Sequence, residues 1–573
     1  MMPYHTNDNG SAGMTQPARA DSPPIDSIPV NAQGNGSPHD SYHAVDTEFL
    51  IVGAGPAGAA LACFLGSHGL QGIMISSASG TANTPRAHIT NMAALECLRD
   101  IGLYDELGRL GSKGADHMQH TRWCHSIAGE EYARIYSWGN DPRRKGDYKL
   151  SSLCDPFDLP QTILEPVLVR HAASKGFKCR FDSALVSFTN DPNTGLITAN
   201  IEDKLSHKDY QIRTRYLFGA DGARSEVVKQ LNLPLIVQPS QGAAINILVK
   251  ADLSYLVKSR TGNLHWVMQP DREHPGFGWM GIVRMVKPWN KWMFILFPDP
   301  NRDRSQEFIG DDTRADILSI STWHINEIVA EKYSEGDIFC LGDAVHRHPP
   351  FNGLGSNTCI QDTFNLAWKI AYIHKGLASL SLLSTYSVER QPVSYSIITR
   401  ANQAFRDQYL VWRALGMLPV DVTERIMIMD ELKSATPEGV VRRRALHEAP
   451  KPYALSGRAA ENSVLFHEPS TYPGSRLPHA WLNKSIPGEP TSTIDIAGHG
   501  SFVLLSGIGG GLWKKAAGNM SALLKVPITV QYIGFRQDWE DESGAVAPEV
   551  LRNAEECEWK LLTVMRSILG FAA

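Results

Sequence analysis

A glycine-rich segment near residue 55 has the residue types and the spacing of a nucleotide-binding turn. It reads Gly53-Ala-Gly55-Pro-Ala-Gly58 and follows an apolar run, residues 48–53, that is typical of a buried parallel strand. In such a turn the first glycine permits the tight bend, the second lets the backbone approach a pyrophosphate, and the third lets helix and strand pack closely. The start of the following helix, near residues 56–69, offers free N–H groups to phosphate. The segment predicts a dinucleotide site, and a small-residue turn without a ligand is the alternative.

A second buried strand, residues 72–76, completes a β-α-β opening. In this arrangement an acidic residue normally ends the second strand and binds the ribose of the adenosine. Here Ser76 or Ser77 occupies that place. A hydroxyl can still form a hydrogen bond to the ribose, but without charge assistance the bond is weaker.

Two further segments place a carboxylate at the end of a predicted strand. Residues 216–219 lead into Asp221 and Gly222, and residues 337–342 lead into Asp343. Ligands of α/β folds bind at the carboxyl ends of strands, so both carboxylates are candidate ligand contacts. An Asp-Gly pair alone is more often a plain turn.

The three motifs, in this order, resemble the pattern of class A flavoprotein hydroxylases. The resemblance implies that Asp343 binds the ribityl chain of FAD, and that Asp221 and Gly222 are associated with both FAD and NAD(P)H. It also implies that Arg86 is the arginine on the flavin side and that Gln161 is a glutamine that contacts the flavin. The further cofactor-binding residues on this basis are Ala57, Ser76, Pro350, Gly353, Gly355 and Asn357.

From about residue 46 to about residue 540 the chain is more similar still to the bacterial 2,4-dichlorophenol 6-monooxygenase and phenol hydroxylase group. The segments that carry this resemblance are residues 84–91, 155–165, 281–290, 346–358, 361–369 and 477–482. The reaction that it implies begins when NAD(P)H, with NADPH favoured, reduces FAD. Oxygen then forms the flavin C4a-hydroperoxide, which hydroxylates a phenolic or related aromatic ring, ortho to the hydroxyl.

A phenolate is a better nucleophile than a phenol, so a base beside the substrate hydroxyl would be useful, and His88 is the candidate. Histidine titrates near ~6.5 and an ordinary phenol near ~10, a gap of roughly 5 kcal/mol against proton transfer. Arg284 and Arg86 are candidate helpers, and a polar loop histidine satisfied by backbone groups is the alternative for His88.

Two other groups of residues are open to more than one interpretation. His346 and His348 have the spacing of a metal pair, but no third ligand is evident, and a rigid loop beside the flavin ring, leading into a helix at residues 357–375, is favoured. Trp266, Met268 and Trp279 are candidates for the aromatic substrate pocket. Core packing is the default explanation for such residues.

Composition limits the other possibilities. The 573 residues carry a net charge of -5, so nucleic acid is not an expected partner. No apolar run reaches the roughly 20 residues of a membrane helix, and there is no signal-peptide pattern, which together predict a cytoplasmic protein. The eight cysteines include no C-x-x-C pair, so we expect reduced thiols and no metal site.

We therefore predict an α/β, Rossmann-like FAD-binding fold in several domains. A disordered tail covers residues 1–45, the discontinuous FAD-binding domain residues 46–235 and 331–410, a mainly antiparallel β substrate domain residues 236–330, a helical connector residues 411–464, and a thioredoxin-like domain without C-x-x-C residues 465–573. The family also implies a homodimer. Two alternatives keep the flavin: an epoxidase or ring-modifying oxygenase acting on a polyketide-like product, and a flavin redox protein without oxygenase activity.

Overall fold

The strand that precedes the glycine-rich turn lies at the centre of a parallel sheet. This strand, β1 (Ala44–Val52), pairs in parallel with β2 (Ile73–Ile75) and with residues 211–219 of β10 (Lys208–Gly219). Outside these, β10 pairs with β19 (Ile338–Cys340) and β2 pairs with β7 (Lys178–Arg180). The predicted β-α-β opening is confirmed. Because parallel strands end at one edge of a sheet, the glycine turn and the two Asp motifs meet there.

The computed structural model describes part of the chain. The described residues are 44–143, 145–239, 242–272, 280–297, 309, 312–348, 353–451, 476–477, 479–484, 488–534 and 536–540. The predicted tail, apart from its last two residues, lies outside them, as do Trp279 and Pro350.

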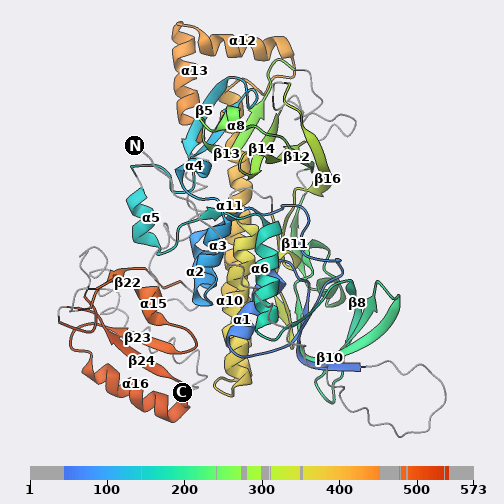
Figure 1. The fold of residues 1–573 in the computed structure, drawn as a ribbon, viewed down its shortest axis with the longest axis vertical. Coiled ribbons are helices and arrows are strands. Elements are labelled where there is room, and N and C mark those ends of the chain that lie inside the picture. The colour runs from blue at the N-terminus through green and yellow to red at the C-terminus, as the bar shows by residue number, and fades with distance from the viewer. Residues whose placement is uncertain are drawn as a thin grey trace, which may run out of the picture. The chain divides into compact units, whose positions relative to one another are not determined.

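Three helices lie side by side (Figure 1) and share one hydrophobic core with the parallel sheet. Helix α1 (Pro56–Ser67) lies beside α10 (Gly355–His374) and α6 (Gln161–Ser174), and its buried residues are mostly alanine and glycine. Small side chains let α1 approach both neighbours closely, and Phe64 meets Phe364 of α10 edge to face at 5.3 Å. Residues 92–110 form two helices, α2 (Met92–Asp100) and α3 (Tyr104–Leu110), because Gly102 takes a positive φ between them.

A second, seven-stranded sheet forms the other large layer. Its order is β16 (Asp316–His324), β12 (Ala243–Lys250), β15 (Lys291–Leu296), β14 (Met280–Lys287), β13 (Gly262–Met268), β4 (His120–Cys124) and β5 (Glu131–Tyr136). Every pairing is antiparallel except that of β13 with β4. The sheet therefore extends beyond the predicted limits of 236–330, because β4 and β5 come from a segment that we had placed in the FAD-binding domain.

A long helix leads into the segment predicted as a helical connector, residues 411–464. Helix α11 (Ser384–Ala414) packs through Tyr386 against the hydrophobic core around the parallel sheet, and through Val411 against the core beside the second sheet. It is followed by α12 (Val422–Lys433) and α13 (Pro437–Glu448). None of the described helices combines the length and the apolar character that crossing a bilayer requires.

The last described part of the chain has an α/β pattern, as expected. Strands β23 (Phe502–Ser506) and β24 (Ile528–Tyr532) pair in parallel, and α16 (Gly511–Leu524) connects them. The ion pair between Arg99 of α2 and Asp495 of α15 (Thr493–Ala497) links this part to the FAD-binding core.

The remaining elements are short or peripheral. They are β3 (Ile89–Thr90), α4 (Ala115–Met118), α5 (Lys145–Ser151), β6 (Phe157–Asp158), β8 (Ser183–Asn190), β9 (Ile197–Asp203), α7 (Glu226–Gln230), β11 (Leu235–Gln238), α8 (Ser254–Val257), β17 (Glu327–Ala330), β18 (Ser334–Glu335), β20 (His346–Arg347), β21 (Trp481–Leu482) and β22 (Thr491–Ser492).

Candidate flavin and substrate site

The glycine turn has the geometry that a pyrophosphate requires. Gly53 has φ of +111°, and a Cβ there would stand 2.1 Å from the carbonyl oxygen of Ala220. A Cβ on Gly58 would stand 1.8 Å from the carbonyl oxygen of Gly53, whereas a Cβ on Gly55 would meet nothing closer than 3.8 Å. Two glycines therefore close the turn, and the third leaves one side open to a ligand. Because no side chain caps the start of α1, its first N–H groups can bind phosphate.

The two strand-end carboxylates differ in how far the protein itself uses them. Asp343 follows β19 in a short turn and is exposed. Asp221 is partly buried, and its Oδ2 accepts the N–H of Glu226 at 2.7 Å at the start of α7. Within the described part of the chain its Oδ1 is buried without a hydrogen-bond partner, and burial raises the pKa of Asp221. Asp343 is therefore free to bind a cofactor, whereas Asp221 already stabilises α7 with one oxygen and leaves the other unsatisfied.

The loop that carries Arg86 is held to the start of α6. The N–H of Gln161 donates to the carbonyl of Ala87 at 2.8 Å, and the N–H of Ala87 donates back to Oε1 of Gln161 at 3.3 Å. Arg86 itself is exposed. The structure thus brings the two residues implied by the resemblance next to each other, and their contact with flavin stays a prediction.

The side chain of Asn357 connects the start of α10 to the strand that follows His88. Its Oδ1 accepts the N–H of Asn91 at 2.9 Å, and its Nδ2 donates to the carbonyl of Ile89 at 2.8 Å. It is 1% exposed. Nδ2 also donates to the carbonyl of Gly353 in the loop before α10. Asn357 therefore fixes the predicted flavin loop relative to the predicted base.

His88 lies in a buried polar cluster that the sequence did not reveal in full. The pairing of β3 with β6 sets Ile89 opposite Asp158 and brings His88 Nδ1 to 3.6 Å from Asp158 Oδ1. The other carboxylate oxygen, Oδ2, accepts hydrogen bonds from Arg284 Nη2 at 3.1 Å and from Asn263 Nδ2 at 3.2 Å. His88 and Arg284 are thus brought to the same carboxylate, and their part in the reaction stays a prediction. Asp158 and Asn263 were missed, because only long-range strand pairing places them there.

The charges of this cluster follow from burial and neighbours. Burial lowers the pKa of His88, the positive charge of Arg284 lowers it further, and Asp158 opposes both. Burial alone would raise the pKa of Asp158, but Arg284, His88 and Asn263 together outweigh burial and lower it. At neutral pH the cluster therefore holds a neutral imidazole beside an ionised carboxylate–guanidinium pair.

Other predicted site residues lie in packed surroundings. Trp266 and Met268 are fully buried in the core between the second sheet and helices α11 and α12, so a substrate contact stays a prediction for them. His346 Nε2 lies 2.8 Å from Asp362 Oδ2, and Arg390 donates to the other oxygen of this carboxylate at 2.7 Å. Among the described residues, no group of His, Cys, Asp and Glu side chains could hold a metal ion.

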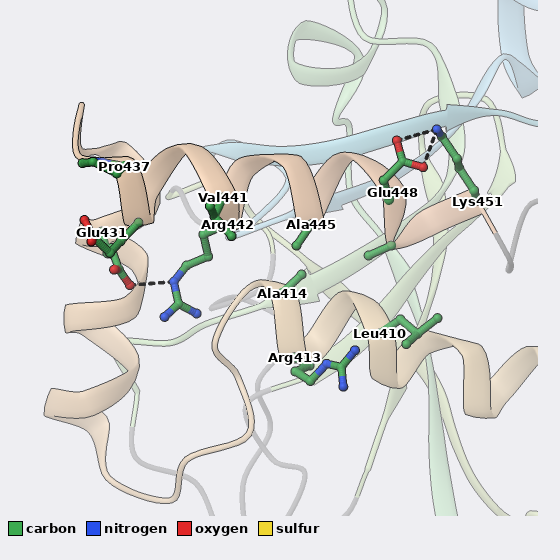
Figure 2. Close-up of a pocket in the computed structure, with 12 residues that line it drawn as sticks. Leu410, Arg413, Ala414, Glu431, Pro437, Val441, Arg442, Ala445, Glu448 and Lys451 are labelled. Atoms are coloured by element: carbon green, nitrogen blue, oxygen red, sulfur yellow. Dashed lines mark hydrogen bonds and ion pairs between the residues drawn. The ribbon is translucent and has the colours of Figure 1, made fainter.

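A cavity of about 920 Å³ lies elsewhere, between α11, α12 and α13. Figure 2 shows Arg413 and Arg442 on facing helices at its sides, with Arg442 paired to Glu431. None of the glycine-turn residues and no member of the His88 cluster lines it. Its size alone does not make it the reaction site, because the motif residues lie elsewhere, at the carboxyl ends of the parallel strands.

Comparison with known proteins agrees with this geometry. The FAD binding domain family matches residues 46–401, most of the chain. The chain belongs to this family. It is 41% identical over 539 residues to 2,4-dichlorophenol 6-monooxygenase of Cupriavidus pinatubonensis (strain JMP 134 / LMG 1197), which covers 88% of this chain and 90% of that protein. It is 36% identical to phenol 2-monooxygenase of Pseudomonas sp. (strain EST1001), over 88% and 86% of the two chains.

A solved structure has the same fold. The flavin-dependent monooxygenase PieE, in complex with FAD and substrate, superposes with a TM-score of 0.81 at 34% identity, covering 88% of this chain and 92% of that one. The chain is therefore an FAD-dependent aromatic monooxygenase, and NAD(P)H is the co-substrate typical of such enzymes. The open glycine turn, the exposed Asp343 and the unsatisfied Oδ1 of Asp221 fit FAD.

Proposed function

We propose that this enzyme hydroxylates a phenol at the carbon ortho to the hydroxyl, with His88 as the group that takes the phenolic proton. The observation that carries the proposal is the neutral, buried His88 with the ionised Asp158 at its Nδ1. The printed activities of the relatives, on dichlorophenol and phenol, support the same substrate class.

Each member of the cluster has a distinct part in this proposal. FAD, when bound and reduced by NAD(P)H, would activate O₂ so that one of its oxygen atoms is transferred to the ring. Proton transfer from the phenol leaves a phenolate, whose ring is more electron-rich, and an imidazolium at His88. Asp158 stabilises that imidazolium, while Arg284 and Asn263 hold the carboxylate in place through its other oxygen.

The lowered pKa of His88 favours acidic phenols. For a phenol that titrates near ~10 the transfer is uphill by roughly 5 kcal/mol or more, whereas for one near ~7.5 the gap from an ordinary histidine is only about 1.4 kcal/mol. Ring substituents that withdraw electrons, such as halogens, bring a phenol into that range. We therefore propose a halogenated or otherwise acidified phenol as the substrate.

A screen of phenols tests this function. The purified enzyme with FAD is given NADH or NADPH, oxygen and one phenol at a time, and NAD(P)H oxidation is compared with product formed. We expect a phenol to accelerate NAD(P)H oxidation and to yield a catechol with one added oxygen atom derived from O₂. A loss of ring unsaturation or an altered carbon skeleton would instead identify an epoxidase or ring-modifying oxygenase. Flavin reduction without any oxygenated product would identify a redox protein.

We also propose that residues 465–573 form a thioredoxin-like domain and that the enzyme is a homodimer in the cytoplasm. The parallel pair of β23 and β24 with α16 between them supports the first proposal. Without a C-x-x-C pair this domain has a structural role. Sedimentation of the purified enzyme tests the dimer.

A further inference from the structure

A buried glutamate lies beside the open side of the glycine turn. Glu165, in the second turn of α6, is 3% exposed. Its Oε1 lies 3.8 Å from where a Cβ on Gly55 would stand, which is the side of the turn that faces a pyrophosphate. Its Oε2 accepts the N–H of Ala82, in the loop that follows β2, at 2.5 Å. One carboxylate therefore borders both the pyrophosphate turn and the loop after the second strand.

This carboxylate has acceptor capacity that the protein leaves unused. In the described part of the chain Glu165 is in no ion pair, and each of its oxygens accepts one hydrogen bond, Oε1 from Gln161 and Oε2 from Ala82. A carboxylate can accept about four. Burial raises the pKa of Glu165, an effect that these two hydrogen bonds and Arg86 only partly offset. A hydrogen bond from a donor group of the bound cofactor would therefore stabilise the ionised carboxylate of Glu165.

The sheet order indicates which half of FAD would lie near Glu165. Helix α6 leads into β7, the neighbour of β2, whereas Asp343 follows β19 on the opposite side of β1. A dinucleotide that crosses the turn after β1 places its adenosine over β2. Strand β2 ends at Ile75 and is followed by Ser76, whose Oγ accepts the N–H of Ala78. The strand therefore offers no carboxylate to the ribose.

We propose that Glu165 is the acidic residue that binds the adenosine ribose of FAD. A helix supplies the contact that, in the usual form of this fold, comes from the end of the second strand. The carboxylate accepts a hydrogen bond from a ribose hydroxyl while Gln161 and the backbone of Ala82 hold it in place. Ser76 then has no essential part in cofactor binding.

The test measures binding to the apoenzyme by calorimetry, with FAD and with ADP, which has the adenosine ribose and the pyrophosphate but no flavin. The variant Glu165→Gln keeps an oxygen that can accept the N–H of Ala82. Glu106→Gln is the matched control, since Glu106 of α3 is partly exposed and forms an ion pair with Arg170 of α6. We expect Glu165→Gln to lower the affinity for FAD and for ADP alike by about 10- to 150-fold, the range for a charge-assisted hydrogen bond. Glu106→Gln should change neither affinity.

Two results would overturn the proposal. If the variant binds FAD more weakly but binds ADP normally, Glu165 contacts the flavin half of the cofactor and not the adenosine ribose. If neither ligand weakens while the melting temperature falls, the glutamate only holds the loop after β2. A rescue variant strengthens the test: Ser76→Glu in the Glu165→Gln background should restore ADP affinity, because it puts an acid at the end of the strand. Should Glu165→Gln fail to fold, 2′-deoxy-ADP and 3′-deoxy-ADP are measured on the wild-type apoenzyme, and one must bind at least tenfold more weakly than ADP.

Discussion

The Nδ1 atom of His88 lies 3.6 Å from the Oδ1 atom of Asp158, and both residues are buried. Two short strands determine this approach, because β3 continues directly from His88 and β6 contains Asp158. The carboxylate cannot swing away, since its other oxygen is held by Arg284 and Asn263. The position of the proposed proton acceptor is therefore set by backbone pairing, and Asn357 ties the same strand to the helix behind the predicted flavin loop.

The first prediction concerns His88 and the acidity of the substrate. His88→Ala should lower kcat by about 10²- to 10⁴-fold with a phenol of pKa near ~10, the usual loss for a general base. With a phenol of pKa near ~7 the deficit should shrink to less than about tenfold, because much of the substrate is already ionised. Product formation by the FAD-loaded enzyme measures both. His125→Ala, at a partly exposed histidine paired with Asp271, is the control and should change neither rate. An equal loss with both phenols would contradict proton transfer.

The second prediction contrasts two glycines of the same turn. Gly58→Ala should destabilise the apoenzyme by about 1–3 kcal/mol, because its methyl group would collide with the carbonyl of Gly53. Gly55→Ala should change apoenzyme stability by less than about 1 kcal/mol, since its methyl group meets nothing closer than 3.8 Å. Gly55→Ala should nevertheless lower the affinity for FAD at least tenfold, because its methyl group would stand where we expect the pyrophosphate to approach. Denaturant unfolding and FAD titration separate the two effects. Similar stability losses would argue against this geometry.

Local sequence signals predicted the elements whose pattern is complete within a short stretch. The glycine turn and the strands β1, β2 and β19 fall where the apolar runs placed them. What could not be predicted depends on pairings between distant segments. The membership of β4 and β5 in the second sheet requires the parallel pairing of β4 with β13, and Asp158 joins the site only because β6 pairs with β3.

The sequence indicated the strand on which a side chain lies more readily than what covers that side chain. Trp266 alternates along a strand in the way that either a core residue or a pocket residue would, and its full burial against α11 and α12 depends on helices more than a hundred residues later in the chain. Glu165 ends a segment that carries the resemblance, but the sequence did not mark its side chain, because its proposed role depends on the distance to Gly55.

The third prediction concerns Asp343. Asp343→Ala should raise the Kd for FAD by about 10- to 150-fold, because it removes a charge-assisted hydrogen bond worth about 1.5–3 kcal/mol. The matched control is Asp337→Ala, which removes a carboxylate just before the other end of β19, 3.9 Å from Arg215. This control should bind FAD normally. Titration of the apoenzyme followed by flavin fluorescence measures both. Full FAD retention by Asp343→Ala at nanomolar protein concentration would remove Asp343 from the site.

The last prediction is that the two charged partners of His88 shift the pH profile in opposite directions. His88 accepts a proton only when it is neutral, so kcat/KM should fall as the pH drops through its pKa. In the wild type this acid limb should lie below ~6.5, since burial and Arg284 lower that pKa. Asp158→Asn should move the limb to lower pH and lower the plateau, because the imidazolium loses its counter-ion. Arg284→Gln should move the limb to higher pH, because a positive charge that opposes protonation is removed.

The profiles are measured between pH 4.5 and 8 with a phenol that titrates near ~10, so that substrate ionisation does not contribute. Shifts in the same direction, in variants that keep their melting temperature and FAD, would show that the acid limb does not report on His88.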